Sequence, residues 1–255
     1  MSIALIGKGA IGSYVLNSLA SSKAPIAAMI VRPGQQDGIN TFASVSDLPG
    51  DIHLVIDCGG HEALRAHGLD ALRRGLDVVT VSIGALANAE LETKLTEAAQ
   101  KSGATLHLAS GAIGALDALR SANIGAMTSV TYTGRKPPQG WKGSPAENAI
   151  ELDRLSKATA HFKGTARNAA LAYPKNANVA AAVALSSLGL DNTVVELIAD
   201  PNISSNIHEI KASGEFGEFT FTIAGNGLPE NPKSSALAAM SVVAKVLEDR
   251  KPIRF

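Results

Sequence analysis

Histidine and cysteine are the side chains with the widest chemical use, and this sequence has six histidines and one cysteine, Cys58. His208 lies in the segment Asn206-Ile-His-Glu-Ile-Lys211, which predicts a strand. Side chains alternate along a strand, so His208 shares a face with Ile210, while Glu209 lies on the other face. A histidine that titrates near neutral pH can act as a general acid or base in a cleft. The alternative is a structural histidine held by a hydrogen bond, and the pattern leaves both open.

The other histidines give no metal-binding pattern. His53 and His107 lie at or inside predicted strands, and His161 has no motif around it. His61 and His67 are spaced as H-E-x₄-H, which is not the H-E-x-x-H of zinc proteases, and no cysteine or third ligand is near them in sequence. We therefore expect no metal site, although His61 follows a predicted strand and can contact a ligand there.

Three glycines give the strongest binding signal. Gly7, Gly9 and Gly12 form G-x-G-x-x-G between an apolar run at 3–6 and a helical spacing of apolar residues at 11–19. The first glycine permits a tight turn, the second lets the backbone approach a pyrophosphate, and the third lets the helix pack close to the strand. The free N–H groups at the start of the helix face the phosphates. We expect a dinucleotide here; the alternative is a tight strand–helix turn without a ligand.

The cofactor preference depends on the end of the second predicted strand, which has the sequence Ile30-Val-Arg-Pro33. The acidic residue that usually holds the ribose 2′-OH of NAD is missing, and Arg32 can pair with a 2′-phosphate instead. A solvated arginine in a turn is the alternative, so we expect NAD or NADP. Cys58 has no basic partner in sequence, and we expect it to pack beside the nicotinamide rather than act as a nucleophile. The predicted cofactor-binding residues of this region are Gly7, Gly9, Ala10, Ile11, Gly12, Arg32, Cys58 and Gly59.

Strands and helices alternate in the first half of the chain. Strands are predicted at 3–6, 26–31, 41–45, 53–58, 77–82 and 105–109, and helices at 11–19, 62–74 and 88–101. Continuous apolar strands separated by helices predict an α/β fold with a doubly wound parallel sheet of the Rossmann type. Ligands bind at the carboxyl ends of such strands, which makes three loops, 57–60, 82–85 and 110–114, candidates for the binding site.

After about residue 124 the pattern changes. Strands are predicted at 127–133, 193–199, 206–212 and 216–223, helices at 146–155, 164–171, 179–188 and 232–247, and a loop at 134–145 that carries the single tryptophan. Strands without long helices between them predict an antiparallel or mixed sheet, and therefore a second, α+β domain. We expect a dinucleotide-binding domain at 1–109, an α+β domain at 110–231, and a C-terminal segment, 232–255, that packs back on the first domain.

Composition excludes several classes of protein. The formal net charge is zero, which gives no electrostatic footprint for nucleic acid or an anionic membrane. Apolar stretches are interrupted well short of a membrane span, and the N-terminus shows no basic region or cleavage site. A single cysteine suits a reducing compartment. We expect a soluble cytoplasmic protein with a core supplied by 45% hydrophobic residues.

Several longer motifs carry a family resemblance across nearly the whole chain. They are Gly7-Lys-Gly-Ala-Ile-Gly12, Val81-Ser-Ile-Gly-Ala-Leu86, Ser110-Gly-Ala-Ile-Gly-Ala-Leu-Asp-Ala-Leu119, Pro174-Lys-Asn-Ala-Asn-Val-Ala-Ala181, Ile198-Ala-Asp-Pro201, Asn206-Ile-His-Glu-Ile210 and Asn231-Pro-Lys-Ser-Ser235. This set resembles the L-aspartate dehydrogenase family, which is similar in architecture to dihydrodipicolinate reductase and homoserine dehydrogenase. The resemblance implies a homodimer that oxidatively deaminates L-aspartate to iminoaspartate, then oxaloacetate and ammonia, with NAD or NADP as hydride acceptor. It also implies a supply of iminoaspartate to NAD biosynthesis.

The resemblance assigns roles to individual residues. His208 matches the catalytic histidine, and Ala112 and Asn178 match cofactor-contacting positions. Lys8 departs from the small or thiol side chains common at its position, but there the backbone does the binding. The two substrate carboxylates need cationic or N–H partners. The candidates are Arg167, Lys175, Lys233 and Ser234.

The sequence is also compatible with two rival functions. An oxidoreductase like dihydrodipicolinate reductase or homoserine dehydrogenase has the same architecture, but the former needs a richer basic cluster than this sequence shows. A non-catalytic NAD(P)-binding sensor would bind cofactor without turnover, and a second domain that retains His208 argues against it.

Overall fold

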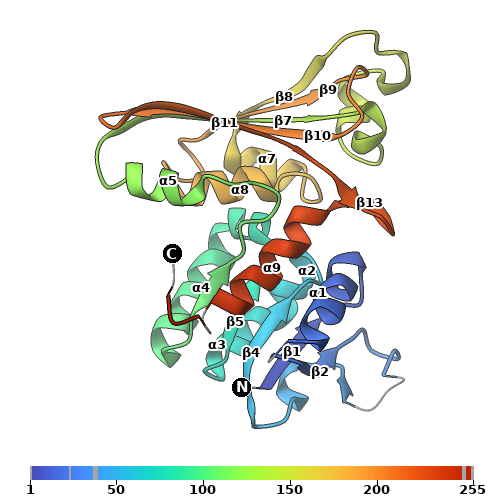
Figure 1. Cartoon of the computed structure of the whole chain (residues 1–255), viewed down its shortest axis with the longest axis vertical. Helices are drawn as coiled ribbons and strands as arrows, with labels where there is room; N and C mark the ends of the chain where they lie inside the picture. The colour runs from blue at the N-terminus through green and yellow to red at the C-terminus, as the bar shows by residue number, and fades with distance from the viewer. Residues whose placement is uncertain (1, 23, 37–39, 249–250, 254–255) are drawn as a thin grey trace. The chain divides into compact units, whose positions relative to one another are not determined.

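The computed structural model describes residues 2–22, 24–36, 40–248 and 251–253. The chain forms two compact units (Figure 1). The first combines Met1–Gly111 with Ala238–Phe255, and the second is Ala112–Leu237.

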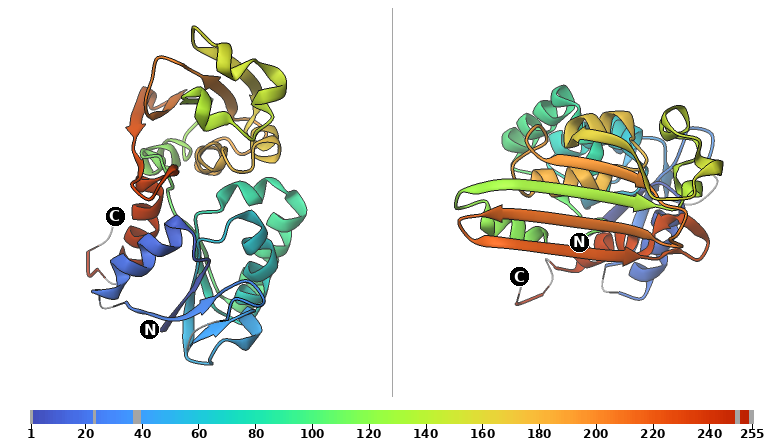
Figure 2. Two further views of the ribbon diagram at one scale, coloured as in Figure 1. Left: turned by 90° about the vertical axis from the view of Figure 1, so that its right-hand side faces the viewer. Right: turned by 90° about the horizontal axis from the view of Figure 1, so that it is seen from above.

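The first unit contains a parallel six-stranded sheet with strand order β3-β2-β1-β4-β5-β6. Its elements are β1 (Ser2–Ile6), α1 (Ala10–Ala20), β2 (Ile26–Ile30), β3 (Thr41–Phe42), η1 (Val45–Asp47), β4 (Ile52–Asp57), α2 (His61–Ala63), η2 (Leu64–Gly68), α3 (Leu69–Arg73), β5 (Asp77–Thr80), η3 (Ile83–Ala87), α4 (Ala89–Ser102), β6 (Leu106–Leu108) and most of α9 (Ala236–Glu248). The strand order reverses between β1 and β4, which places α1 on one face of the sheet and α3 and α4 on the other (Figure 2). Apolar strands such as β1 are therefore buried, and the predicted doubly wound sheet is confirmed.

Helix ends in this unit follow local sequence signals. Asn88 caps α4 by accepting a hydrogen bond from the N–H of Leu91 at 2.8 Å, and Gly103 ends the helix in the left-handed region with φ +78°. The helix predicted at 62–74 is not regular, because a π-helical turn, η2, interrupts it. The predicted strand at 41–45 is shorter than expected and is followed by η1.

The second unit contains a mixed five-stranded sheet with order β11-β10-β7-β9-β8. Its elements are α5 (Leu116–Ala122), β7 (Met127–Lys136), η4 (Pro138–Trp141), α6 (Ala146–Ala149), η5 (Leu152–Arg154), β8 (Thr159–Thr165), α7 (Ala166–Ala172), α8 (Asn178–Leu185), β9 (Val194–Ala199), β10 (Asn206–Gly214), β11 (Gly217–Gly225), β12 (Gly227–Leu228) and β13 (Asn231–Ser235). Strands β7 and β9 are parallel, and the other pairs are antiparallel. Helices α7 and α8 lie along one face of this sheet (Figures 1 and 2). The predicted α+β class with a mixed sheet is confirmed.

Three boundaries in the second unit correct the sequence prediction. Strand β7 continues to Lys136, so the start of the predicted loop at 134–145 is strand. Ile150 adopts an extended conformation and splits the helix predicted at 146–155 into α6 and η5. The predicted helix at 164–171 begins only after β8, a strand that the sequence analysis missed.

The last helix also begins later than predicted. Residues 231–235 form β13, which pairs with β12, and α9 starts at Ala236. The pairing requires glycine at 227, because a Cβ there would lie 2.4 Å from the carbonyl oxygen of Pro232. Lys233 and Ser234 therefore lie on a strand and not at a helix N-terminus.

Candidate active site

The glycine loop of the first unit is tightly packed on one side and open on the other. Gly7 has φ +95°, and a Cβ on it would lie 2.9 Å from Cα of Gly59 in the turn after β4. A Cβ on Gly12 would lie 2.1 Å from the carbonyl oxygen of Gly7, so only glycine lets α1 approach this closely. A Cβ on Gly9 would meet nothing within 4 Å. The loop thus leaves open space where the backbone can approach a ligand.

The start of α1 fits a dinucleotide phosphate. Gly9 caps the helix without any side-chain hydrogen bond, and the first turn, which holds Ala10 and Ile11, contains no acidic residue. Unsatisfied N–H groups and the positive end of the helix dipole favour an anion at this point. The residues present therefore fit the cofactor that the motif predicts.

A buried carboxylate joins the loops after β4 and β5. Asp57 is fully buried; its Oδ2 accepts hydrogen bonds from Thr80 Oγ1 at 2.7 Å and Ser82 Oγ at 2.6 Å. Its Oδ1 accepts the N–H of Gly59 at 3.0 Å. Burial raises the pKa of Asp57, and the hydrogen bonds from Ser82 and Thr80 oppose that rise. The sequence analysis did not single out Asp57, which holds the loop that contacts Gly7.

Cys58 and Arg32 follow β4 and β2, the two strands that flank β1. Burial raises the pKa of the Cys58 thiol well above its usual range, which keeps it protonated and unsuited to nucleophilic attack. Its Cβ lies 3.7 Å from where a Cβ on Gly12 would be, which makes it part of the packing behind the glycine loop. Arg32 is exposed in the turn after β2, and its carbonyl accepts the N–H of Gln35 at 3.0 Å. Cofactor contact by these two residues stays a prediction.

In the second unit, His208 is held by a tyrosine from the adjacent strand. The His208 side chain is 4% exposed, and its Nδ1 lies 2.7 Å from the hydroxyl of Tyr132 on β7. The residue opposite His208 in the β10–β7 register is Gly134. A Cβ on Gly134 would lie 2.8 Å from the Tyr132 hydroxyl, so the glycine leaves the room that this hydrogen bond needs. Burial, with a smaller effect from Lys136, lowers the pKa of His208 to about 4.

Lys136 lies at the end of the same face of β7. Its ammonium donates a hydrogen bond to Oδ1 of Asn176 at 2.7 Å and lies 5.0 Å from the centroid of the Trp141 ring. Burial lowers the pKa of Lys136 to about 8. The positive charge of Lys136 also contributes to lowering the pKa of His161, to about 4, after the larger effect of burial. Lys136 therefore lies within electrostatic reach of both His208 and His161.

His161 completes an aromatic cluster around the tryptophan. Its ring meets the Trp141 ring edge-on at a centroid distance of 4.4 Å, and its Nδ1 lies 3.2 Å from the hydroxyl of Tyr173. Among the described residues, His161 Nε2 is the buried side-chain nitrogen or oxygen that lacks a hydrogen-bond partner. Tyr132, Lys136, His161 and Asn176 were all missed as site residues by the sequence analysis.

Three further residues that the sequence analysis predicted for the site, Ala112, Arg167 and Asn178, belong to the second unit. Asn178 is the first residue of α8, two residues after Asn176, and Ala112 is buried at the start of the second unit. Arg167 is already paired, since its Nε and Nη2 donate to the two carboxylate oxygens of Asp191 at 2.7 and 2.8 Å.

Within the part of the chain that the structure describes, the other three candidates for substrate contact make no such pair. Lys175 is exposed in the loop before α8, and Lys233 is exposed on β13. Ser234 Oγ accepts a hydrogen bond from the side chain of Asn231 at 3.2 Å. Substrate contact by Arg167 and by these three residues stays a prediction.

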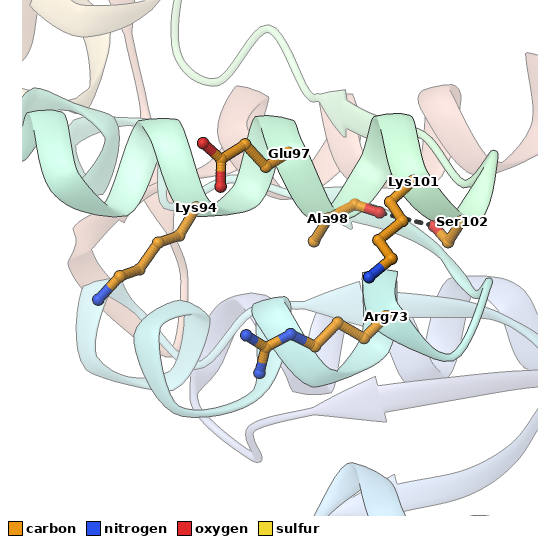
Figure 3. Close-up of a pocket in the computed structure, with 6 residues that line it drawn as sticks. All are labelled: Arg73, Lys94, Glu97, Ala98, Lys101 and Ser102. Atoms are coloured by element: carbon orange, nitrogen blue, oxygen red, sulfur yellow. Dashed lines mark hydrogen bonds between the residues drawn. The ribbon is translucent and has the colours of Figure 1, made fainter.

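A pocket of about 530 Å³ lies elsewhere on the first unit (Figure 3). It is lined by Arg73, Lys94, Glu97, Ala98, Lys101 and Ser102. Arg73 and Lys101 come from the last turns of α3 and α4, the helix ends that precede β5 and β6. The pocket is therefore not at the carboxyl ends of the strands, where the glycine loop lies.

Two negative findings concern the described part of the chain. No group of three or more His, Cys, Asp or Glu side chains is placed to hold a metal ion. No helix in those residues has the length and apolar character needed to cross a membrane.

The glycine loop on a doubly wound sheet, followed by a unit with a mixed sheet, defines the class of NAD(P)-dependent dehydrogenases that bind the dinucleotide in a Rossmann-type domain. Residues 7–109 match the family described as "Homoserine dehydrogenase, NAD binding domain", and residues 117–248 match "Aspartate dehydrogenase, C-terminal". The chain belongs to the L-aspartate dehydrogenase family.

Individual relatives agree over almost the full length. The L-aspartate dehydrogenase of Ruegeria pomeroyi is 52% identical over 258 residues, which covers 99% of this chain and 94% of the relative. That of Pseudomonas aeruginosa is 45% identical over 254 residues, with 95% of each chain covered. Among solved structures, aspartate dehydrogenase from Thermotoga maritima has the same fold, with a TM-score of 0.80, 24% identity, and coverage of 100% of this chain and 99% of that chain.

Proposed function

We propose that this chain catalyses the NAD(P)-dependent oxidative deamination of L-aspartate to iminoaspartate, which water converts to oxaloacetate and ammonia. The observation that carries the proposal is the 52% identity to the Ruegeria pomeroyi L-aspartate dehydrogenase over 99% of the chain. The glycine loop with Gly7, Gly9, Ala10, Ile11 and Gly12 would hold the pyrophosphate, and the nicotinamide would supply the acceptor for the hydride that leaves Cα of aspartate.

His208 is the proposed proton acceptor for the substrate amine. Its lowered pKa keeps the imidazole neutral at physiological pH. Its Nε2 makes no hydrogen bond within the described part of the chain, while Nδ1 is occupied by Tyr132. A neutral imidazole at this position can take a proton from the amine, or from the water that attacks the imine.

Tyr132 decides which nitrogen of His208 can accept that proton. Burial raises the pKa of the Tyr132 hydroxyl, so the tyrosine keeps its hydrogen. When Nδ1 donates to the tyrosine oxygen, Nε2 carries a lone pair and serves as a base. When the tyrosine donates to Nδ1, Nε2 carries the hydrogen and serves as a donor. The orientation of the buried Tyr132 hydroxyl thus favours one of the two neutral tautomers of His208.

The test is to replace His208 with glutamine. We expect turnover with L-aspartate to fall by about 10²–10⁴-fold, while the affinity for the reduced cofactor, measured by fluorescence, stays nearly unchanged. His53→Gln is the control, because His53 is exposed on β4 of the other unit. Wild-type rates in His208→Gln would rule out the catalytic role. Absorbance assays of the wild type with L-aspartate and either NAD or NADP would show whether the protein is an enzyme or a non-catalytic sensor. The ratio of the rates with the two cofactors would show whether Arg32 favours NADP.

Four further properties belong to the proposal. Arg32 supports use of NADP as well as NAD. The family resemblance supports a homodimer, and light scattering on the purified chain would give its mass. The single cysteine supports a cytoplasmic location, and a supply of iminoaspartate to NAD biosynthesis would be tested by the growth of a deletion strain without exogenous pyridine precursors.

A further inference from the structure

The second unit contains a partly buried lysine without an acidic partner. Lys136 is half-buried at the end of β7, and its described contacts are the neutral Asn176 and the face of Trp141. Within the described residues, no carboxylate lies within 4.0 Å of its ammonium. A cation removed from water without a counter-charge is unfavourable, and a bound anion at Lys136 would supply the missing charge.

Three other cations of this unit already have carboxylate partners. Arg135, the preceding residue on the opposite face of β7, pairs with Asp200 at 3.2 Å. Lys142 pairs with Asp153 at 2.7 Å. Arg167 is likewise bound to Asp191. Lys136 differs from these three because its charge is unbalanced.

The ammonium of Lys136 lies on the same face of the sheet as His208, the proposed proton acceptor. Tyr132, Gly134 and Lys136 alternate along one face of β7, and Gly134 is directly opposite His208. Asn176 fixes the ammonium from the loop that leads to Asn178 and α8. An anion at Lys136 would therefore lie on the same sheet face as the proposed proton acceptor.

We propose that Lys136 binds one of the two carboxylates of the dicarboxylate substrate, with Asn176 as the positioning residue for its ammonium. This assignment rests on the proposed function, because L-aspartate is the dicarboxylate in question. It also has a consequence for the proton transfer: a carboxylate at Lys136 offsets the positive charge that helps to lower the pKa of His208, so His208 becomes more basic when substrate is bound.

The test is binding of succinate, an amine-free dicarboxylate, measured by calorimetry with and without reduced cofactor. We expect Lys136→Met to weaken succinate binding by about 10–100-fold and to raise KM for L-aspartate by a similar factor. Lys136→Arg should retain most of the affinity, because it keeps the charge. Lys163→Met is the matched control, since Lys163 is exposed on β8, the edge strand of the same sheet, and it should bind like the wild type.

Equal succinate affinity in Lys136→Met and the wild type would overturn the proposal, as would a fall in kcat with unchanged KM and unchanged succinate binding. A wild type that binds no succinate in either condition would also overturn it. Succinate binding that depends on Lys136 in a protein without L-aspartate turnover would keep the anion site and reject the proposed function. The two proposals can thus fail separately.

A second measurement needs no variant. Among the titratable groups around Lys136, His161 on β8 and His208 on β10 have pKa values lowered to about 4, and the pKa of Tyr173 is raised. None of these changes charge between pH 7 and 9, whereas burial lowers the pKa of Lys136 to about 8. Between pH 7 and 9, succinate affinity should fall as pH rises through about 8. Affinity that does not change between pH 7 and 9 would contradict the assignment.

Discussion

The hydrogen bond between Tyr132 and His208 is the most informative contact at the residue scale. Removal of the hydroxyl in Tyr132→Phe leaves Nδ1 of His208 buried without its 2.7 Å partner. We expect turnover to fall by about 3–10-fold, with little change in KM for L-aspartate. Nitrogen-15 NMR of the imidazole would show a changed ratio of the two tautomers. An unchanged ratio would mean that Tyr132 does not select the form of His208.

Among the residues around His208, sequence reasoning singled out His208 itself but not Tyr132 or Lys136. The strand alternation of 206–211 predicted the face of His208, because that face is apolar and the other is charged. Lys136 was missed because the strand predicted at 127–133 was expected to end at Thr133, whereas β7 continues to Lys136. Gly134 looked like the start of a loop, whereas in the structure it makes room for the Tyr132 hydroxyl. A glycine that serves a close contact cannot be distinguished in sequence from one that ends a strand.

At the scale of elements, two alanine variants in the glycine loop between β1 and α1 can be compared with a control variant outside it. In Gly12→Ala the new methyl group would collide with the carbonyl of Gly7, so we expect a loss of about 1–3 kcal/mol in stability together with weak cofactor binding. In Gly9→Ala the methyl group points into open space, so stability should be kept while cofactor affinity falls at least about tenfold.

Gly50→Ala is the control for both variants, because its Cβ also meets nothing within 4 Å and it lies outside the loop. Chemical denaturation and cofactor fluorescence would be measured on all three. Full cofactor affinity in Gly9→Ala would show that the backbone at this position does not approach the ligand.

The elements of the first unit were largely predictable, because apolar strands and capped helices repeat regularly there. The second unit was harder to predict. Strand β8 carries Lys163 and Gly164 and contains a bulge at His161, so its pattern of burial is irregular. Strand β13 contains a proline and is paired only with the two residues of β12, a contact set by tertiary structure rather than by propensity.

At the scale of the whole molecule, the buried histidines make stability depend on pH. The pKa of His208 is about 4 in the folded state and about 6.5 when unfolded, so the unfolded chain binds more protons between these values. The stabilising effect is complete above pH 6.5 and is lost as pH falls toward 4, by up to about 3 kcal/mol from His208 alone. His161 acts in the same direction.

The single tryptophan makes this measurable for one unit. Trp141 is fully buried in the second unit and donates its indole N–H to the carbonyl of Ile198 at 3.0 Å, so its fluorescence reports unfolding there. Urea denaturation between pH 7.5 and 4.5 should show a smaller loss of stability for His208→Gln than for the wild type. Parallel curves for the two proteins would contradict a neutral, buried His208.

The order in which the chain is synthesised gives the contact between Gly111 and Ser241 a further meaning. The hydroxyl of Ser241 on α9 donates to the carbonyl of Ala238 and accepts the N–H of Gly111, directly after the last part of the nucleotide-binding sheet. As the chain is synthesised, all residues of the second unit are added before residue 238 and the rest of this helix. The unit that begins first is therefore the last to be completed, and a chain truncated after Leu237 would contain the whole second unit and an unfinished cofactor unit.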